Sequence, residues 1–207
     1  MLRRGDKKRP KLAKDTEPVL RLSCAADWHA WLASHHAGAR GVLLRIAKDG
    51  SESVTYPEAL DVALAWGWID SQKRALDATA WLQRFTPRAV KSPWSKLNRA
   101  KAEALISAGK MQPPGLAEVE RAKRDGRWKR AYDGARTSGV PADLGAALAR
   151  NSRARLFFEA LDSANRYAIL YRVQTAKKLA TRAERIARFV AMCARHETIH
   201  ATRRAKT

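Results

Sequence analysis

Residues 66–99 alternate basic and aromatic side chains, and this combination is suited to binding an anion. The segment begins WGWIDSQKR and ends RFTPRAVKSPWSKLNR. Arginine and lysine pair with phosphates and carboxylates, and aromatic faces stack against planar groups. The residues predicted to bind the anion are Asp70, Arg84, Arg88, Trp94, Ser95, Asn98 and Arg99. We expect the side chains of Arg88, Ser95 and Arg99 to share one concave, solvent-reachable surface.

Core packing is the alternative for the same segment, and the sequence leaves it open. The large aromatic residues concerned are Trp66, Trp68, Trp81 and Trp94. They could form most of the core of a small sheet, with the basic residues as an exposed rim. Asp70 is the acidic residue closest to the basic cluster. Because Lys73 and Arg74 follow it, its carboxylate should stay ionised and pair with a cation rather than act as a general acid. We assign no catalytic residue, and an enzyme acting on a small anionic substrate remains an alternative.

The string HETIH, residues 196–200, matches the HExxH motif of zinc proteases. That chemistry needs both histidines on one helix face and a third protein ligand, which in those proteases follows downstream. Only ATRRAKT follows here, so the match is interpreted as chance. Cys24 and Cys193 are too few for a four-cysteine zinc site, and the sequence contains no glycine-rich nucleotide loop and no G-x-S-x-G motif. The sequence therefore predicts neither a metal ion nor a cofactor.

The net charge is strongly positive, which favours an anionic ligand or partner. The 207 residues include 41 Lys+Arg and 20 Asp+Glu, giving a formal charge of +21 and an isoelectric point near 10.8. A non-specific nucleic-acid-binding protein is one alternative, in which phosphate contacts make binding fall steeply with salt. A solvated basic surface without a partner is another. No zinc-finger or RNA-recognition signature accompanies the charge, and the sequence indicates neither a specific protein partner nor an oligomeric state.

The sequence also carries information about the compartment. No apolar run approaches the roughly 18 residues that would span a bilayer. The basic start, MLRRGDKKRPKLAKD, has no apolar segment behind it that would make it a secretory signal. Two cysteines do not form a disulfide scaffold. We therefore expect a cytoplasmic protein without a transmembrane segment.

Hydrophobic periodicity and turn residues place the strands in the first half of the chain and most helices in the second. The first half is expected to contain a helix over 25–34, a hairpin through Asp49-Gly50, a helix from a Thr55 cap to Gly67, and strands over 68–76 and 81–88. The second half is expected to contain helices over about 92–109 with Ser92 as cap, 113–126, 141–149, 153–161, 163–177 and 181–195. This segregation predicts an α+β fold: a small, mostly antiparallel sheet with helices, followed by an all-helical C-terminal module.

Composition and periodicity divide the chain into four segments. They are a disordered basic tail over 1–23, a mixed α+β domain over 24–138, a helical module over 139–195 and a frayed basic tail over 196–207. The boundary near residue 138 rests on a run of small residues between 136 and 140.

Several separated motifs occur in the order found in one known family. They are GWIDSQ, RFTPR, SPWSKLNR, the GKM of residues 109–111, GRWKRAYDG, SANRYAILYR and TAKKLATRAERI. Together they resemble the YdeI/OmpD-associated, or bacteriocin-protection, family over roughly residues 26–194. The resemblance implies a bacterial stress- or bacteriocin-tolerance protein that acts by binding. It implies a small all-helical module in the last third of the chain, and it supplies no defined reaction and no catalytic residues.

Overall fold

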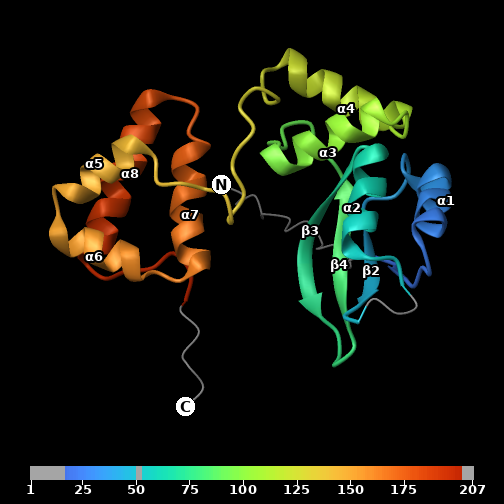
Figure 1. Ribbon diagram of the computed structural model, residues 1–207, viewed down its shortest axis with the longest axis horizontal. Coiled ribbons are helices and arrows are strands. Elements are labelled where there is room, and N and C mark those ends of the chain that lie inside the picture. Colours follow the sequence, from blue (N-terminus) through green and yellow to red (C-terminus); the bar gives the residue numbers. More distant parts are fainter. Residues whose placement is uncertain (1–16, 50–52, 202–207) are drawn as a thin grey trace, which may run out of the picture. The chain divides into compact units, whose positions relative to one another are not determined.

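The computed structural model describes residues 17–49 and 53–201 and has the predicted α+β fold (Figure 1). The chain divides into two compact units. Their described residues are 17–49, 53–90 and 104–119 in unit 1, and 91–103 and 120–201 in unit 2. Helices α3 (Lys96–Ser107) and α4 (Pro113–Arg124) each contribute residues to both units.

Unit 1 is built on a four-stranded sheet. Its strands are β1 (Val19–Leu20), β2 (Val42–Ala47), β3 (Trp68–Ala75) and β4 (Ala80–Pro87), in the order β1-β2-β4-β3. The pairs β2–β4 and β3–β4 are antiparallel, and the short β1 runs parallel to β2. The predicted mostly antiparallel sheet is therefore confirmed.

An aromatic core packs between the sheet and the helices α1 (Ala25–His35) and α2 (Tyr56–Ala65). Trp28 of α1 lies 6.2 Å from Trp68 and 5.7 Å from Phe85, measured between ring centroids. All three side chains are fully buried. Trp28 also donates its indole N–H to the Ala59 carbonyl of α2 at 3.0 Å. For Trp68, the core-packing alternative is therefore correct.

Local signals fix both ends of α2, and here the sequence prediction is confirmed. The Thr55 side chain accepts from the Glu58 N–H, and the Glu58 carboxylate accepts from the Thr55 N–H at 3.0 Å, which is a capping box. After the helix, Gly67 has φ +73°, a conformation that residues with a side chain rarely adopt. This turn leads the chain directly into β3.

Two predictions for this half of the chain are wrong. Residues 53–56, where the second strand of the predicted Asp49-Gly50 hairpin would lie, form no strand, because Val54 donates its N–H to the Leu22 carbonyl and Thr55 caps α2. The predicted disordered tail over 1–23 is also too long, since Val19 and Leu20 pair with Leu43 and Leu44. Two apolar residues among charges gave too weak a periodic signal to be recognised. Positions 1–16 of that tail lie outside the described residues.

Glu17 ties the start of β1 to the sheet, and its replacement should have a pH-dependent effect. Arg84 donates its Nε–H to Glu17 Oε2 at 2.7 Å, and this hydrogen bond lowers the pKa of Glu17. We expect Glu17→Gln to reduce the free energy of unfolding by at most about 1 kcal/mol at neutral pH. The contribution is present above the ordinary glutamate pKa of about 4.3 and is lost as the pH falls through the lowered value. Urea unfolding across acidic pH should therefore show the two proteins converging. A constant difference would assign the effect to packing instead.

Unit 2 is helical. Besides its parts of α3 and α4 it contains α5 (Ala142–Ala149), α6 (Ser152–Ala160), α7 (Ser163–Gln174) and α8 (Leu179–Ala194). Its core is formed by Leu144, Leu148, Ala154, Phe158, Ile169, Leu170, Val173, Ile186, Phe189 and Cys193. These residues recur at helical spacing, so the predicted helical module over this region is confirmed.

The segment after α8 is ordered to a greater extent than the sequence predicts. The buried Asn165 of α7 accepts the His200 N–H at 2.8 Å and donates to the His200 carbonyl at 3.3 Å, and Ile199 packs against the core. The prediction of a frayed end starting at residue 196 is therefore wrong for residues 196–200, while residues 202–207 lie outside the described part. The HETIH string does not lie on a helix, because α8 ends at Ala194 and His196 has φ +60°.

Candidate anion-binding site

Three of the predicted binding residues belong to unit 1. Asp70, on β3, accepts a hydrogen bond from the Tyr56 hydroxyl at 2.9 Å. Arg84 is engaged by Glu17. Arg88 is only 4% exposed, and its N–H donates to the Gly67 carbonyl where β4 ends. The prediction that Arg88 lies on a solvent-reachable surface is therefore wrong.

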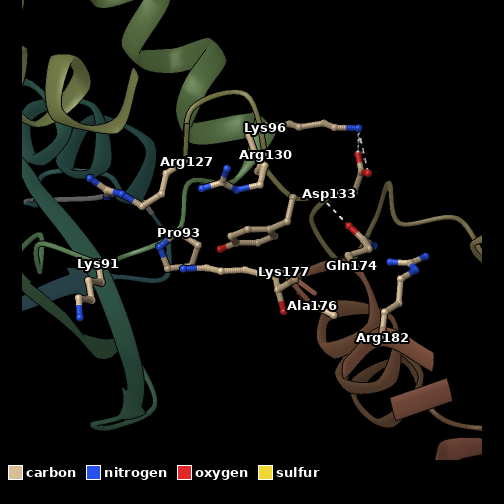
Figure 2. A pocket seen from close by; sticks show the side chains of 13 residues that line it. Lys91, Pro93, Lys96, Arg127, Arg130, Asp133, Gln174, Ala176, Lys177 and Arg182 are labelled. Carbon is tan, nitrogen blue, oxygen red and sulfur yellow. Dashed lines mark hydrogen bonds and ion pairs between the residues drawn. The ribbon is translucent and has the colours of Figure 1, made fainter. Parts of the chain in front are cut away.

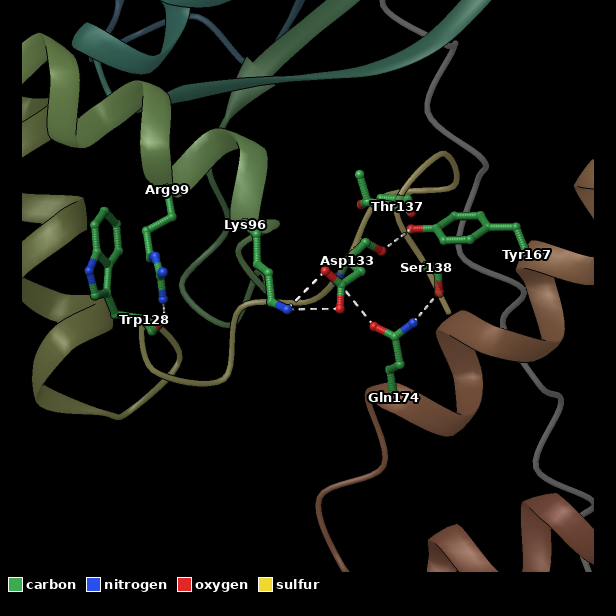
Figure 3. A network of polar contacts seen from close by, with 9 residues as sticks. Lys96, Arg99, Trp128, Asp133, Thr137, Ser138, Tyr167 and Gln174 are labelled. Atoms are coloured by element: carbon green, nitrogen blue, oxygen red, sulfur yellow. Dashed lines mark hydrogen bonds and ion pairs between the residues drawn. The ribbon is translucent and has the colours of Figure 1, made fainter. Parts of the chain in front are cut away.

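The other four predicted residues belong to unit 2. Trp94 is 1% exposed and packs edge-on against Trp128, so the core-packing alternative is correct for it. Ser95 caps α3 by accepting the N–H of Asn98, whose side chain is buried; the predicted cap at Ser92 is one turn too early. Arg99 donates to the Trp128 carbonyl at 3.4 Å (Figure 3). For Asp70, Arg84, Ser95 and Arg99, anion binding stays a prediction.

Unit 2 contains a pocket of about 340 Å³ whose wall is strongly cationic (Figure 2). Six basic residues line it: Lys91, Lys96, Arg127, Arg130, Lys177 and Arg182. One carboxylate, Asp133, lines it with them. The remaining lining residues are Pro93, Ala131, Tyr132, Gln174, Thr175 and Ala176. The volume lies within the range typical of small-ligand pockets.

Three of the six cations have carboxylate partners. Lys96 lies 2.9 Å from the Asp133 carboxylate, which also lines the pocket. Arg127 pairs with Asp125 at 2.7 Å, and Arg182 pairs with Asp143 at 2.6 Å. The hydrogen bonds from Arg182 lower the pKa of Asp143 and keep it charged near neutral pH. These pairs orient the side chains but leave the pocket with a positive balance.

The other three cations give the pocket its excess positive charge. The side chains of Lys91 and Lys177 form no ion pair or hydrogen bond with any residue of the ranges 17–49 and 53–201. Arg130 donates only to a backbone carbonyl, that of Asp125, at 3.0 Å. Arg127 is 93% buried, and its guanidinium is held by Asp125 and by the Ser92 carbonyl, to which Nη1 donates at 2.8 Å.

A hydrogen-bond network around Asp133 holds the pocket together (Figure 3). The Asp133 N–H donates to Gln174 Oε1 at 3.0 Å, and the Tyr167 hydroxyl donates to the Asp133 carbonyl at 3.2 Å. The Gln174 amide nitrogen donates to the Ser138 hydroxyl. The backbones of Ser95 and Tyr132 form a parallel bridge on the other side of the turn. These bonds connect α7 with the turn at 127–133 and with the chain preceding α3.

The positive charge of the described chain is concentrated in unit 2. Its described residues include 22 Lys and Arg against nine Asp and Glu, whereas those of unit 1 include nine against eight. The pocket thus lies in the unit with the larger excess of positive charge, and such an excess raises the local concentration of anions.

None of the seven predicted binding residues lines the pocket. The predicted set lies between Asp70 and Arg99, whereas the wall is formed by Lys91, Pro93 and Lys96 and by residues of the segments 127–133 and 174–182. A signal was present, because GRWKRAYDG repeats the basic–aromatic alternation of residues 66–99. Spacing along the chain could not show that these segments meet.

Family comparisons match two parts of the chain. Residues 137–196 match the family described as bacteriocin-protection, YdeI or OmpD-associated, which confirms the resemblance for the helical module. Residues 20–118 match a domain of unknown function, DUF8412. The turn at 127–133, which lines the pocket, lies between the two matches. No curated protein and no solved structure matches the chain.

In the described part of the chain, no helix is both long enough and apolar enough to cross a bilayer.

Proposed function

We propose that this chain, whose residues 137–196 match the bacteriocin-protection, YdeI or OmpD-associated family, acts by binding a small anionic ligand in the unit 2 pocket. One observation carries the proposal: three cations of the pocket wall, Lys91, Arg130 and Lys177, have no carboxylate partner in the described chain. Charges of one sign gathered in a concave site attract a ligand of the opposite sign. Tolerance to a stress or to a bacteriocin would then depend on this ligand.

The chemistry of the wall favours binding over reaction. Asp133 is ion-paired with Lys96, and the Thr175 hydroxyl donates to the Tyr171 carbonyl at 2.7 Å. Neither group is therefore placed as a general base or nucleophile. The cations instead suit the recognition of phosphate or carboxylate oxygens.

Lys177→Ala tests the proposal because the Lys177 ammonium has no ion-pair or hydrogen-bond partner among the described residues. A hydrogen bond to a charged group is worth about 1.5–3 kcal/mol, so pyrophosphate should bind at least about tenfold more weakly to the variant. The measurement is isothermal titration calorimetry at about 0.15 M salt, where long-range effects are screened.

Lys178→Ala is the matched control. It removes the same charge from the adjacent exposed residue, which does not line the pocket. We expect its affinity for pyrophosphate to change less than about twofold. Equal losses in both variants, or no pyrophosphate binding by the wild type, would contradict the proposal.

Non-specific nucleic-acid binding is a second candidate, favoured by the concentration of Lys and Arg in unit 2. Such binding would be spread over the basic surface and would fall steeply with salt. It would not require the pocket.

We place either activity in the cytoplasm, in keeping with two free cysteines, one exposed and one buried.

A further inference from the structure

We infer that the pocket takes a nucleoside diphosphate, or a ligand of that class: two linked phosphates joined to a neutral, hydrogen-bonding body. This inference rests on the proposed function and names the ligand class. It follows from the charge of the pocket, from the unequal character of its two ends, and from the apolar part of its wall.

The charge of the pocket sets the number of negative groups. Lys91, Arg130 and Lys177 are the three cations that form no ion pair with a described carboxylate, although the charge of Arg130 helps to lower the pKa of Asp125. A terminal phosphate carries between about one and a half and two negative charges at neutral pH, so a diphosphate carries about three. A diphosphate therefore balances the wall, whereas a single carboxylate would leave most of its charge uncompensated.

The cations are not spread evenly around the pocket. In the view of Figure 2, the charged ends of Arg130 and Lys177 lie toward one end (left), those of Lys91 and Arg127 point outward beyond that end, and those of Lys96 and Arg182 lie toward the other end (right). Arg130 and Lys177 at the first end form no ion pair in the described chain. The linked phosphates belong at this end.

The opposite end is unsuited to a second anionic group. It contains the Asp133 carboxylate and the Gln174 side chain, and both cations there are paired with carboxylates. A carboxylate repels another anion but accepts hydrogen bonds from hydroxyl or amino groups. The part of the ligand at this end is therefore neutral and carries donors, as a ribose or a base does.

The wall of the pocket is partly apolar. Pro93, Ala131, Tyr132 and Ala176 contribute to it. Inorganic pyrophosphate would leave this surface exposed to water, whereas a ligand with an organic body would bury it. The pocket volume of about 340 Å³ accommodates such a body.

The test is calorimetric titration of the full chain with ADP, GDP, CDP and UDP, with pyrophosphate and with a short single-stranded oligonucleotide. We expect at least one nucleoside diphosphate to bind tenfold or more tightly than pyrophosphate. In Asp133→Asn, the advantage of that nucleotide over pyrophosphate should fall at least fivefold, while pyrophosphate binds as well as before or better. The backbone bonds of Asp133 remain possible in this variant. Should it fail to fold, Ala176→Leu should block the organic body and spare pyrophosphate.

Each other outcome counts against the inference. Equal affinity for pyrophosphate and for every nucleoside diphosphate overturns the ligand class and leaves the proposed function intact. Binding of neither overturns both. If the oligonucleotide bound more tightly than every nucleoside diphosphate, the ligand would be nucleic acid and not a small anion. If the nucleotide kept its full advantage over pyrophosphate in both variants, its organic body would not lie at the Asp133 end of the pocket, and the inference would be wrong.

Discussion

Replacing Gly115 with alanine is expected to lower the free energy of unfolding by about 3 kcal/mol, although alanine is normally the better helix former. A Cβ atom at position 115 would lie 2.2 Å from the Ala65 carbonyl oxygen and 2.8 Å from Met111 Sδ. The carbonyl is backbone at the end of α2 and already accepts the Gln112 N–H at 3.1 Å. The clash therefore cannot be relieved by rotating a side chain, and α2 and the start of α4 must separate.

Gly145→Ala is the matched control for this measurement. Gly145 lies inside α5, where an added Cβ would meet only Val140 Cγ1, at an ordinary 3.8 Å. Its replacement should raise stability by about 0.5–1 kcal/mol through helix propensity alone. Urea denaturation of both variants gives the comparison. If Gly115→Ala matched the wild type, the close approach of these two helices would not exist in solution.

The elements were largely predictable from the sequence because their signals are local. The Thr55 capping box, the glycine after α2 and the alternation in β4 each involve residues within a few positions of one another. The errors arose where a distant segment supplied the partner. Val19 forms a strand only because Leu43 lies beside it, and residues 196–200 are ordered because Asn165 binds them.

The candidate site was less predictable for the same reason. The basic–aromatic pattern correctly indicated an abundance of cations, but it could not say which ones already had partners or lay inside. Arg84 is engaged by Glu17, 67 positions away in the sequence, and Arg88 is buried. Lys177 stands in a polar loop without aromatic neighbours, so nothing in its local pattern marked it. Its importance arises only from the pocket that it lines.

Reversing two charges of the pocket should abolish pyrophosphate binding. In Arg130→Glu/Lys177→Glu, two charged donors are lost and two carboxylates face the ligand, so affinity should fall by more than about 100-fold. Both residues are exposed, and neither belongs to the helical core, so the melting temperature should stay close to that of the wild type.

The double variant Arg124→Glu/Arg150→Glu separates a pocket from a diffuse charge. It makes the same change in net charge at two exposed residues of unit 2 that do not line the pocket. At physiological salt the screening length is about 8 Å, so pyrophosphate affinity should change less than about threefold. A non-specific nucleic-acid binder behaves differently, because each surface cation contributes similarly to phosphate contacts. Its affinity for an oligonucleotide, and the dependence of that affinity on salt, should fall equally in the two double variants. Equal losses of pyrophosphate binding would therefore assign the anion affinity to the whole basic surface, and unequal losses assign it to the pocket.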